Sequence, residues 1–195
     1  MQIQNLVIAS RATVRRAADG LVRLAKLERV LALVCIVIPA LLIAFAGLPV
    51  RESISAYYDM PRDQVFYFSL TVASMLFMVN GVVKQQHVYN TILGVMLAGV
   101  VLFDCDHAPV VHYICATAFF GGNGTVILFF SSRKERSFKA MMTVLIVAAM
   151  LACFAFHLFT LFWAEWVSLA IIALHYFIEA GNGVGEPATE QESGR

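Results

Sequence analysis

The chain has few charged residues. Asp, Glu, Lys and Arg make up 14% of its 195 residues, whereas a soluble domain carries about 25%. Hydrophobic residues make up 60% of the chain, and its mean hydropathy is +0.77. A chain of this length and composition has room for one membrane domain and none for a folded soluble domain. Its formal net charge of +1 says nothing about partners, because the charges are sorted by side of the membrane rather than summed. We expect no nucleic-acid partner.

The sequence also lacks the paired cysteines of a zinc or redox motif. Its four cysteines form no CxxC pair, and three of them lie in apolar runs, where cysteine behaves as a small hydrophobic residue. No cleavable signal peptide is apparent. The first apolar run follows a long basic segment and exceeds about 20 residues, which is too long for the apolar core of a signal peptide. We therefore expect it to be an uncleaved transmembrane helix.

What the sequence does contain is a series of six apolar segments. Each is about 18–24 residues long, so each can cross a hydrocarbon core of about 30 Å as a helix. The segments are residues 27–49, 64–83, 88–105, 108–131, 138–160 and 162–180. We therefore predict an all-α fold in which residues 27–180 form a six-helix transmembrane bundle.

The basic residues fall almost entirely on one side of this bundle. If the N-terminus is cytoplasmic, Arg51 and Arg62 lie outside and the other twelve of the fourteen Lys and Arg residues lie inside. This distribution follows the positive-inside rule. It predicts that both termini are cytoplasmic, and we expect a multi-pass protein of the bacterial cytoplasmic (inner) membrane.

Two segments flank the predicted bundle. In residues 1–26, apolar positions recur at helical spacing opposite a basic face, which predicts an amphipathic helix lying on the anionic cytoplasmic leaflet. The alternative is a basic tail that only sets the topology. Residues 181–195 are rich in Gly, Glu and Ser, so we expect a disordered cytoplasmic tail.

Polar residues that could support chemistry concentrate at the outer side. Counted at about 1.5 Å per residue, His112, His157 and Glu165 should lie about 5–7 Å from the outer boundary. Ionisable groups within a span are costly and usually face the bundle interior. We therefore predict a functional site at this depth, beneath the outer loops that contain Ser53 and Asp63.

Imidazole and carboxylate groups are typical zinc ligands, and a catalytic zinc site needs three of them. Asp104, His107, His112, His157 and Glu165 are the candidates. One hypothesis takes Asp104, His112 and His157 as metal ligands, with a zinc-bound water as nucleophile. Ser53, Asp63 and Glu165 are then the catalytic residues. No HxxxH or HExxH pair is present, and each residue also fits a purely structural role, as a loop, interface or ion-pair residue.

Part of the sequence is similar to a known pattern. Ser53-Ile-Ser-Ala-Tyr-Tyr, followed by Arg62-Asp63 at the start of a span, resembles a signature of small, uncharacterised bacterial multi-pass membrane proteins. Val111-His112-Tyr113 and Glu165 are similar to later parts of that pattern, so the resemblance covers roughly residues 30–180. It implies the fold and no activity. A more distant similarity is to membrane metal hydrolases of the alkaline-ceramidase type, which implies a zinc site in which Glu165 replaces a histidine.

Two kinds of function remain open. The first is an integral membrane component without enzymatic activity, such as a sensor or an assembly partner, whose functional site is the outer polar cluster. The second is a metal-dependent hydrolase that acts on a lipid at the outer leaflet. A transporter fits poorly, because no inverted repeat or pair of broken helices is evident. The bilayer is the one partner that the sequence predicts directly.

Overall fold

The chain is described by a computed structural model that covers residues 26–83, 88–129 and 136–185. Every regular element in these ranges is helical. The elements are a first helix, Lys26–Ala46, a short 3-10 helix η1, Ser55–Asp59, and the helices α2 (Asp63–Val83), α3 (Val88–Leu102), α4 (Pro109–Phe129), α5 (Arg136–Phe154) and α6 (Leu161–Gly185). The predicted all-α, six-helix bundle is confirmed. The amphipathic helix predicted for residues 1–26 lies, except for Lys26, outside the described residues.

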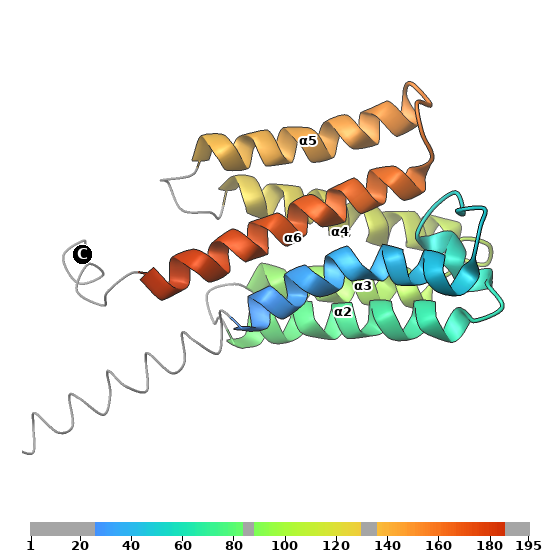
Figure 1. Ribbon diagram of the computed structural model, residues 1–195, viewed down its shortest axis with the longest axis horizontal. Helices are drawn as coiled ribbons and strands as arrows, with labels where there is room; N and C mark the ends of the chain where they lie inside the picture. The colour runs from blue at the N-terminus through green and yellow to red at the C-terminus, as the bar shows by residue number, and fades with distance from the viewer. Residues whose placement is uncertain (1–25, 84–87, 130–135, 186–195) are drawn as a thin grey trace, which may run out of the picture.

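Five of the helices are long and apolar enough to cross a membrane. The exception is α3, whose 15 residues rise about 22 Å. Each helix from α2 to α6 packs against the next in sequence, and α4 also contacts α6. The first helix begins and α6 ends at the same end of the bundle, as the prediction of two cytoplasmic termini requires (Figure 1). We call the opposite end, which carries η1, the outer end.

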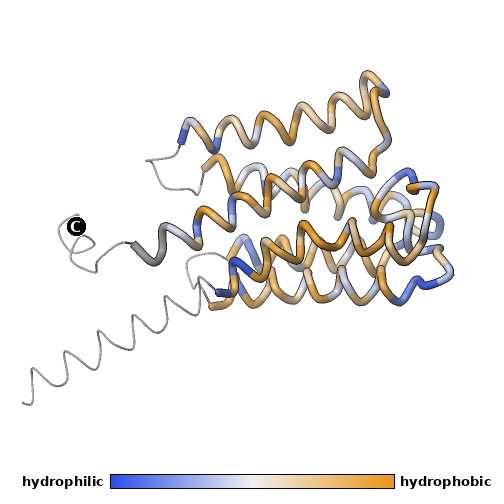
Figure 2. The backbone as a smooth tube through the Cα atoms, viewed as in Figure 1, coloured by the Kyte–Doolittle hydropathy of each residue, from blue (hydrophilic) through white to orange (hydrophobic). Residues whose placement is uncertain are grey.

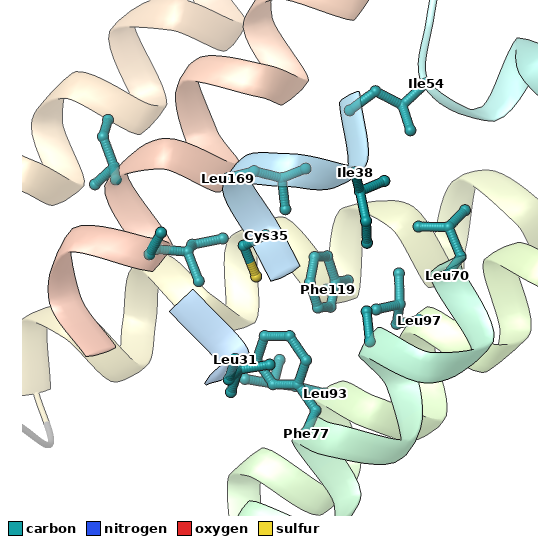
Figure 3. Close-up of a cluster of buried hydrophobic side chains, with 14 of the residues drawn as sticks. Leu31, Cys35, Ile38, Ile54, Leu70, Phe77, Leu93, Leu97, Phe119 and Leu169 are labelled. Carbon is teal, nitrogen blue, oxygen red and sulfur yellow. The ribbon is translucent and has the colours of Figure 1, made fainter. Parts of the chain in front are cut away.

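The first helix supplies the centre of the core. Leu31, Cys35, Ile38 and Leu42 are at most 3% exposed and follow a spacing of four, three and four residues, which is one face of an α-helix. Figure 3 shows this face against Phe77 of α2 and Phe119 of α4, whose rings meet edge to face at 5.3 Å. Figure 2 shows hydrophobic residues along the helices and hydrophilic residues gathered at the outer loops, as a bilayer environment requires.

Three of the predicted helices, namely the first helix, α3 and α5, end earlier than the apolar runs that predicted them. The first helix ends at Ala46 rather than at residue 49, because Gly47 adopts a left-handed conformation (φ 78°) and its N–H bonds to the Ile43 carbonyl. Helix α3 ends at Leu102 because the Asp104 carboxylate accepts the backbone N–H groups of Asp106 and His107 and forms a local turn.

The end of α5 has a direct consequence for the candidate site. His157 has a left-handed backbone (φ 50°), and its N–H bonds to the Cys153 carbonyl at 3.2 Å. The helix therefore stops at Phe154, and the predicted span to residue 160 is too long. His157 lies in the connection to α6 rather than in a helix. At the other end of the chain, α6 continues to Gly185, into the segment predicted to be a disordered tail.

Candidate functional site

The segment before η1 is fastened across the start of α6. The Glu52 carbonyl accepts the Phe162 N–H at 2.7 Å, and the Ile54 N–H donates to Glu165 Oε2 at 2.6 Å. The first N–H groups of a helix have no partner within it, so the loop carbonyl satisfies one of them. Glu165 is 6% exposed, and the backbone hydrogen bond gives this buried carboxylate a donor.

Two serines of this segment have different environments. Ser53 Oγ accepts the Ala56 N–H at 3.0 Å and lies 3.0 Å from Ser55 Oγ. Ser53 therefore stabilises the start of η1. Ser55 Oγ also accepts a weak hydrogen bond from the Cys105 thiol at 3.7 Å, and Ser55 borders two cavities of the bundle. Of the two hydroxyl groups, that of Ser55 is the one placed at a cavity.

His112 is oriented by a backbone carbonyl. Its side chain is buried in α4, and Nδ1 lies 2.7 Å from the Phe103 carbonyl oxygen. Because a carbonyl can only accept, Nδ1 carries a proton, and in the neutral ring Nε2 is left as an acceptor. The connection between α3 and α4 thus fixes the tautomer of His112.

Ser55, His112 and Glu165 meet at one cavity, and we call these three residues the outer site. The cavity has a volume of about 340 Å³ and lies between α4, α5 and α6, with apolar side chains such as Met150 and Phe154 on the α5 side. The same three residues border a second space of about 40 Å³ inside the core. An apolar cavity with a few convergent polar groups is the usual form of a small-molecule site.

The other predicted site residues lie elsewhere. Asp63 is the half-buried first residue of α2, and Ser53 supports η1. The Asp104 carboxylate accepts the backbone N–H of His107 and also lies 2.9 Å (Oδ1 to Nδ1) from the His107 ring. The backbone hydrogen bond, followed by the contact with the ring, holds the pKa of Asp104 below its usual range. His157 is exposed. None of these four borders the cavity of the outer site.

The predicted zinc ligands therefore do not form a ligand set. Asp104 is bonded to His107, His112 is bonded through Nδ1 to a carbonyl, and His157 is in an exposed connection. Among the residues that the structure describes, no group of three or more His, Cys, Asp and Glu side chains could hold a metal ion. Asp104, His112 and His157, the ligands of the zinc hypothesis, therefore do not form a site for one shared metal ion.

The outer loops are joined to each other above the site. Tyr58 of η1 donates a hydrogen bond to Asp106 in the connection between α3 and α4. This bond, ahead of the other causes, raises the pKa of Tyr58 to about 12. Arg51 bonds to the carbonyl oxygens of Ala56 and Asp59, both at 2.9 Å, and so holds the two ends of η1.

A second group of polar side chains lies at the inner half of the bundle. Tyr176 donates to Asn90 Oδ1 at 2.9 Å, and Asn90 donates to Asn80 Oδ1 at 2.7 Å, so α6, α3 and α2 are linked. Lys139 of α5 is fully buried and forms an ion pair with Glu179 of α6. Polar side chains join helices where no water can replace them, so these contacts explain the packing of the inner half.

Comparison with known proteins adds a family and no activity. No curated protein and no solved structure matches the chain, so no link to the alkaline-ceramidase type is found. One family, described as a family of unknown function (DUF7103), matches residues 36–180. That match spans α2, α3, α4 and α5 in full, α6 as far as Ala180 and the second half of the first helix, together with the outer site. This multi-pass, all-helical membrane protein belongs to the family of unknown function DUF7103.

Proposed function

We propose that the outer site binds the polar end of a membrane amphiphile whose apolar chain occupies the cavity between α4, α5 and α6. One observation carries this proposal: Ser55, His112 and Glu165 come from three separate segments and border the same 340 Å³ cavity. Burying three polar side chains in a membrane domain is costly unless they have partners. A ligand with a polar end and an apolar chain matches both parts of the cavity.

The polar groups favour a ligand that carries a hydrogen-bond donor. The neutral His112 ring presents Nε2 as an acceptor, and Glu165 has one carboxylate oxygen bonded to Ile54. Ser55 can donate or accept. A hydroxyl or amine group of a lipid head is the simplest partner for this set.

The test is photocrosslinking with a phosphatidylethanolamine, whose head-group amine supplies the hydrogen-bond donor and whose acyl chain carries a diazirine. Gly121 borders the cavity, and a Cβ atom at this position would meet nothing within 4 Å, so we expect Gly121→Leu to extend into the cavity without moving the backbone. Gly181, which is equally open and lies outside the cavity, gives the matched control Gly181→Leu. We expect crosslinks on α4 and α5 that Gly121→Leu removes and Gly181→Leu keeps. Equal labelling of all three proteins would mean ordinary annular lipid and would contradict the proposal.

A second candidate function is hydrolysis of a bound lipid. The observation that favours it is the tautomer of His112, which is oriented by the Phe103 carbonyl and leaves Nε2 as an acceptor at the cavity that Ser55 also borders. An imidazole acceptor and a serine hydroxyl are the components of a nucleophile–base pair. His112→Asn keeps an N–H for that carbonyl and removes the base. If the site is hydrolytic, lipid extracts from cells that express the wild type should contain fatty acid or head-group products that Ser55→Ala and His112→Asn both lack. Identical lipid profiles would leave binding as the function.

A further inference from the structure

A second, larger groove is lined by the first helix and α2, and neither of these helices lines the cavity of the outer site. It has a volume of about 650 Å³ and runs between the first helix and the outer half of α2. Its lining is apolar apart from Gln64 and Ser69. It shares no lining residue with the cavity of the outer site, so what it binds is independent of the function proposed above.

The groove has the depth of one membrane leaflet. On the first helix its lining extends from Leu33 to Phe45, about 18 Å along the axis, and on α2 from Gln64 to Val72, about 12 Å. Half of a hydrocarbon core of about 30 Å is about 15 Å. Both helices run close to the long axis of the bundle (Figure 1), so the groove extends from the outer end to about mid-membrane.

A positively charged side chain, that of Arg62, lies at the outer end of this groove. The Arg62 guanidinium lies 5.9 Å from the centre of the Phe45 ring, and Phe45 lines the groove. Arg62 is exposed and, within the ranges that the structure describes, it forms no ion pair with a carboxylate. The other outer arginine, Arg51, is already bonded within its own loop. Asp63 is the one acidic neighbour in sequence, and it sits at the positive N-terminal end of α2, which offsets its charge.

We infer that this groove binds one acyl chain of an anionic phospholipid of the outer leaflet, with the lipid phosphate on Arg62. The guanidinium group suits this role because its planar N–H donors match two phosphate oxygens. Its stacking on Phe45 holds it above the groove rather than free in solvent. The proposal joins a chain-length groove to the one outer cation that no described carboxylate neutralises.

The test compares phosphatidylglycerol with phosphatidylcholine added to the purified protein in detergent, read as the lipid concentration that gives half of the maximal rise in melting temperature. We expect phosphatidylglycerol to act at a concentration about fivefold lower. Arg62→Gln should remove this preference, whereas Arg62→Lys should keep part of it. Arg136→Gln, an exposed arginine at the inner end, is the matched control and should behave as the wild type.

The groove itself is tested by filling it. Val37→Trp from the first helix and Val72→Phe from α2 each place a ring in the groove, and two variants guard against one that fails to fold. Both should abolish the rise given by either lipid. If the filled variants respond as the wild type does, the groove is not the binding site. If the filled variants lose the rise in melting temperature while Arg62→Gln keeps the preference for phosphatidylglycerol, the groove binds an acyl chain but Arg62 does not recognise the head group. The inference is then wrong.

Discussion

At the scale of single residues, Glu165 is the side chain that ties the outer loop to the bundle. Its carboxylate accepts the Ile54 N–H, 111 positions away in the sequence. Both groups are buried, so each would be without a partner if the other were removed. The same side chain borders the cavity, and a ligand bound there would also contact the residue that holds η1 in place.

Glu165→Ala should lower the stability of the protein more than Glu165→Gln does. Alanine leaves the Ile54 N–H buried and unpaired, at a cost of about 1–3 kcal/mol, whereas the glutamine carbonyl can still accept. Thermal unfolding in detergent measures the difference. Glu52→Gln, in the same segment but exposed, is the control and should leave the melting temperature unchanged. Equal losses for the alanine and glutamine variants would show that the carboxylate charge, rather than this bond, matters.

His157→Gly should leave the stability unchanged or raise it. The left-handed backbone at this position (φ 50°) costs a non-glycine residue about 1 kcal/mol, and glycine avoids that cost. His157→Val should lower the melting temperature, because a β-branched residue tolerates this conformation least. If instead the glycine variant loses function while remaining folded, His157 has a chemical role that its exposed position in the connection does not explain.

At the scale of elements, the sequence predicts the helices well and only two of the three residues of the outer site. The six helices follow from apolar runs and their length, because a span must satisfy its backbone internally. Helix ends are set by single residues such as Gly47 and Asp104, whose hydrogen bonds are local and leave no trace in hydropathy. His112 and Glu165 were predicted because ionisable groups in spans are rare. Ser55 was not singled out over Ser53, since only the direction of η1 decides which hydroxyl meets the cavity.

The contact between α2 and α3 depends on a glycine. A Cβ at Gly94 would lie 2.7 Å from the Ser74 carbonyl oxygen and 2.9 Å from the Met78 nitrogen, so an alanine there forces the two backbones apart. Gly94→Ala should therefore lower the melting temperature. Gly121→Ala, with no atom within 4 Å of the new methyl group, should be neutral or gain up to about 1 kcal/mol from helix propensity. Similar effects of the two substitutions on thermal unfolding would contradict this account.

At the scale of the whole molecule, the distribution of charge and the position of the loops describe one orientation. Among the residues that the structure describes, Arg51 and Arg62 lie near η1 at the outer end. The other described basic residues lie toward the end where the first helix begins and α6 ends (Figure 1), and these are Lys26, Arg29, Arg136 and Lys139. Both lipid proposals depend on this orientation, because each places a polar group at the outer leaflet. The cysteines offer a way to measure it in intact cells.

Cys105 should react with a membrane-impermeant maleimide added to intact cells. It is half-buried in the connection between α3 and α4, whereas the other three cysteines are buried. Burial, and after it the nearby acidic groups, raise the pKa of the Cys105 thiol, although its bond to Ser55 opposes this. Because the thiolate is the reacting form, labelling should be slow at pH 7 and should keep accelerating as the pH rises past the ordinary thiol pKa of about 8.5.

Cys105→Ser should abolish the labelling of intact cells. In that background Ser137→Cys, exposed at the start of α5, should react only after the cells are permeabilised. The reverse pattern would invert the orientation and move both lipid sites to the cytoplasmic leaflet.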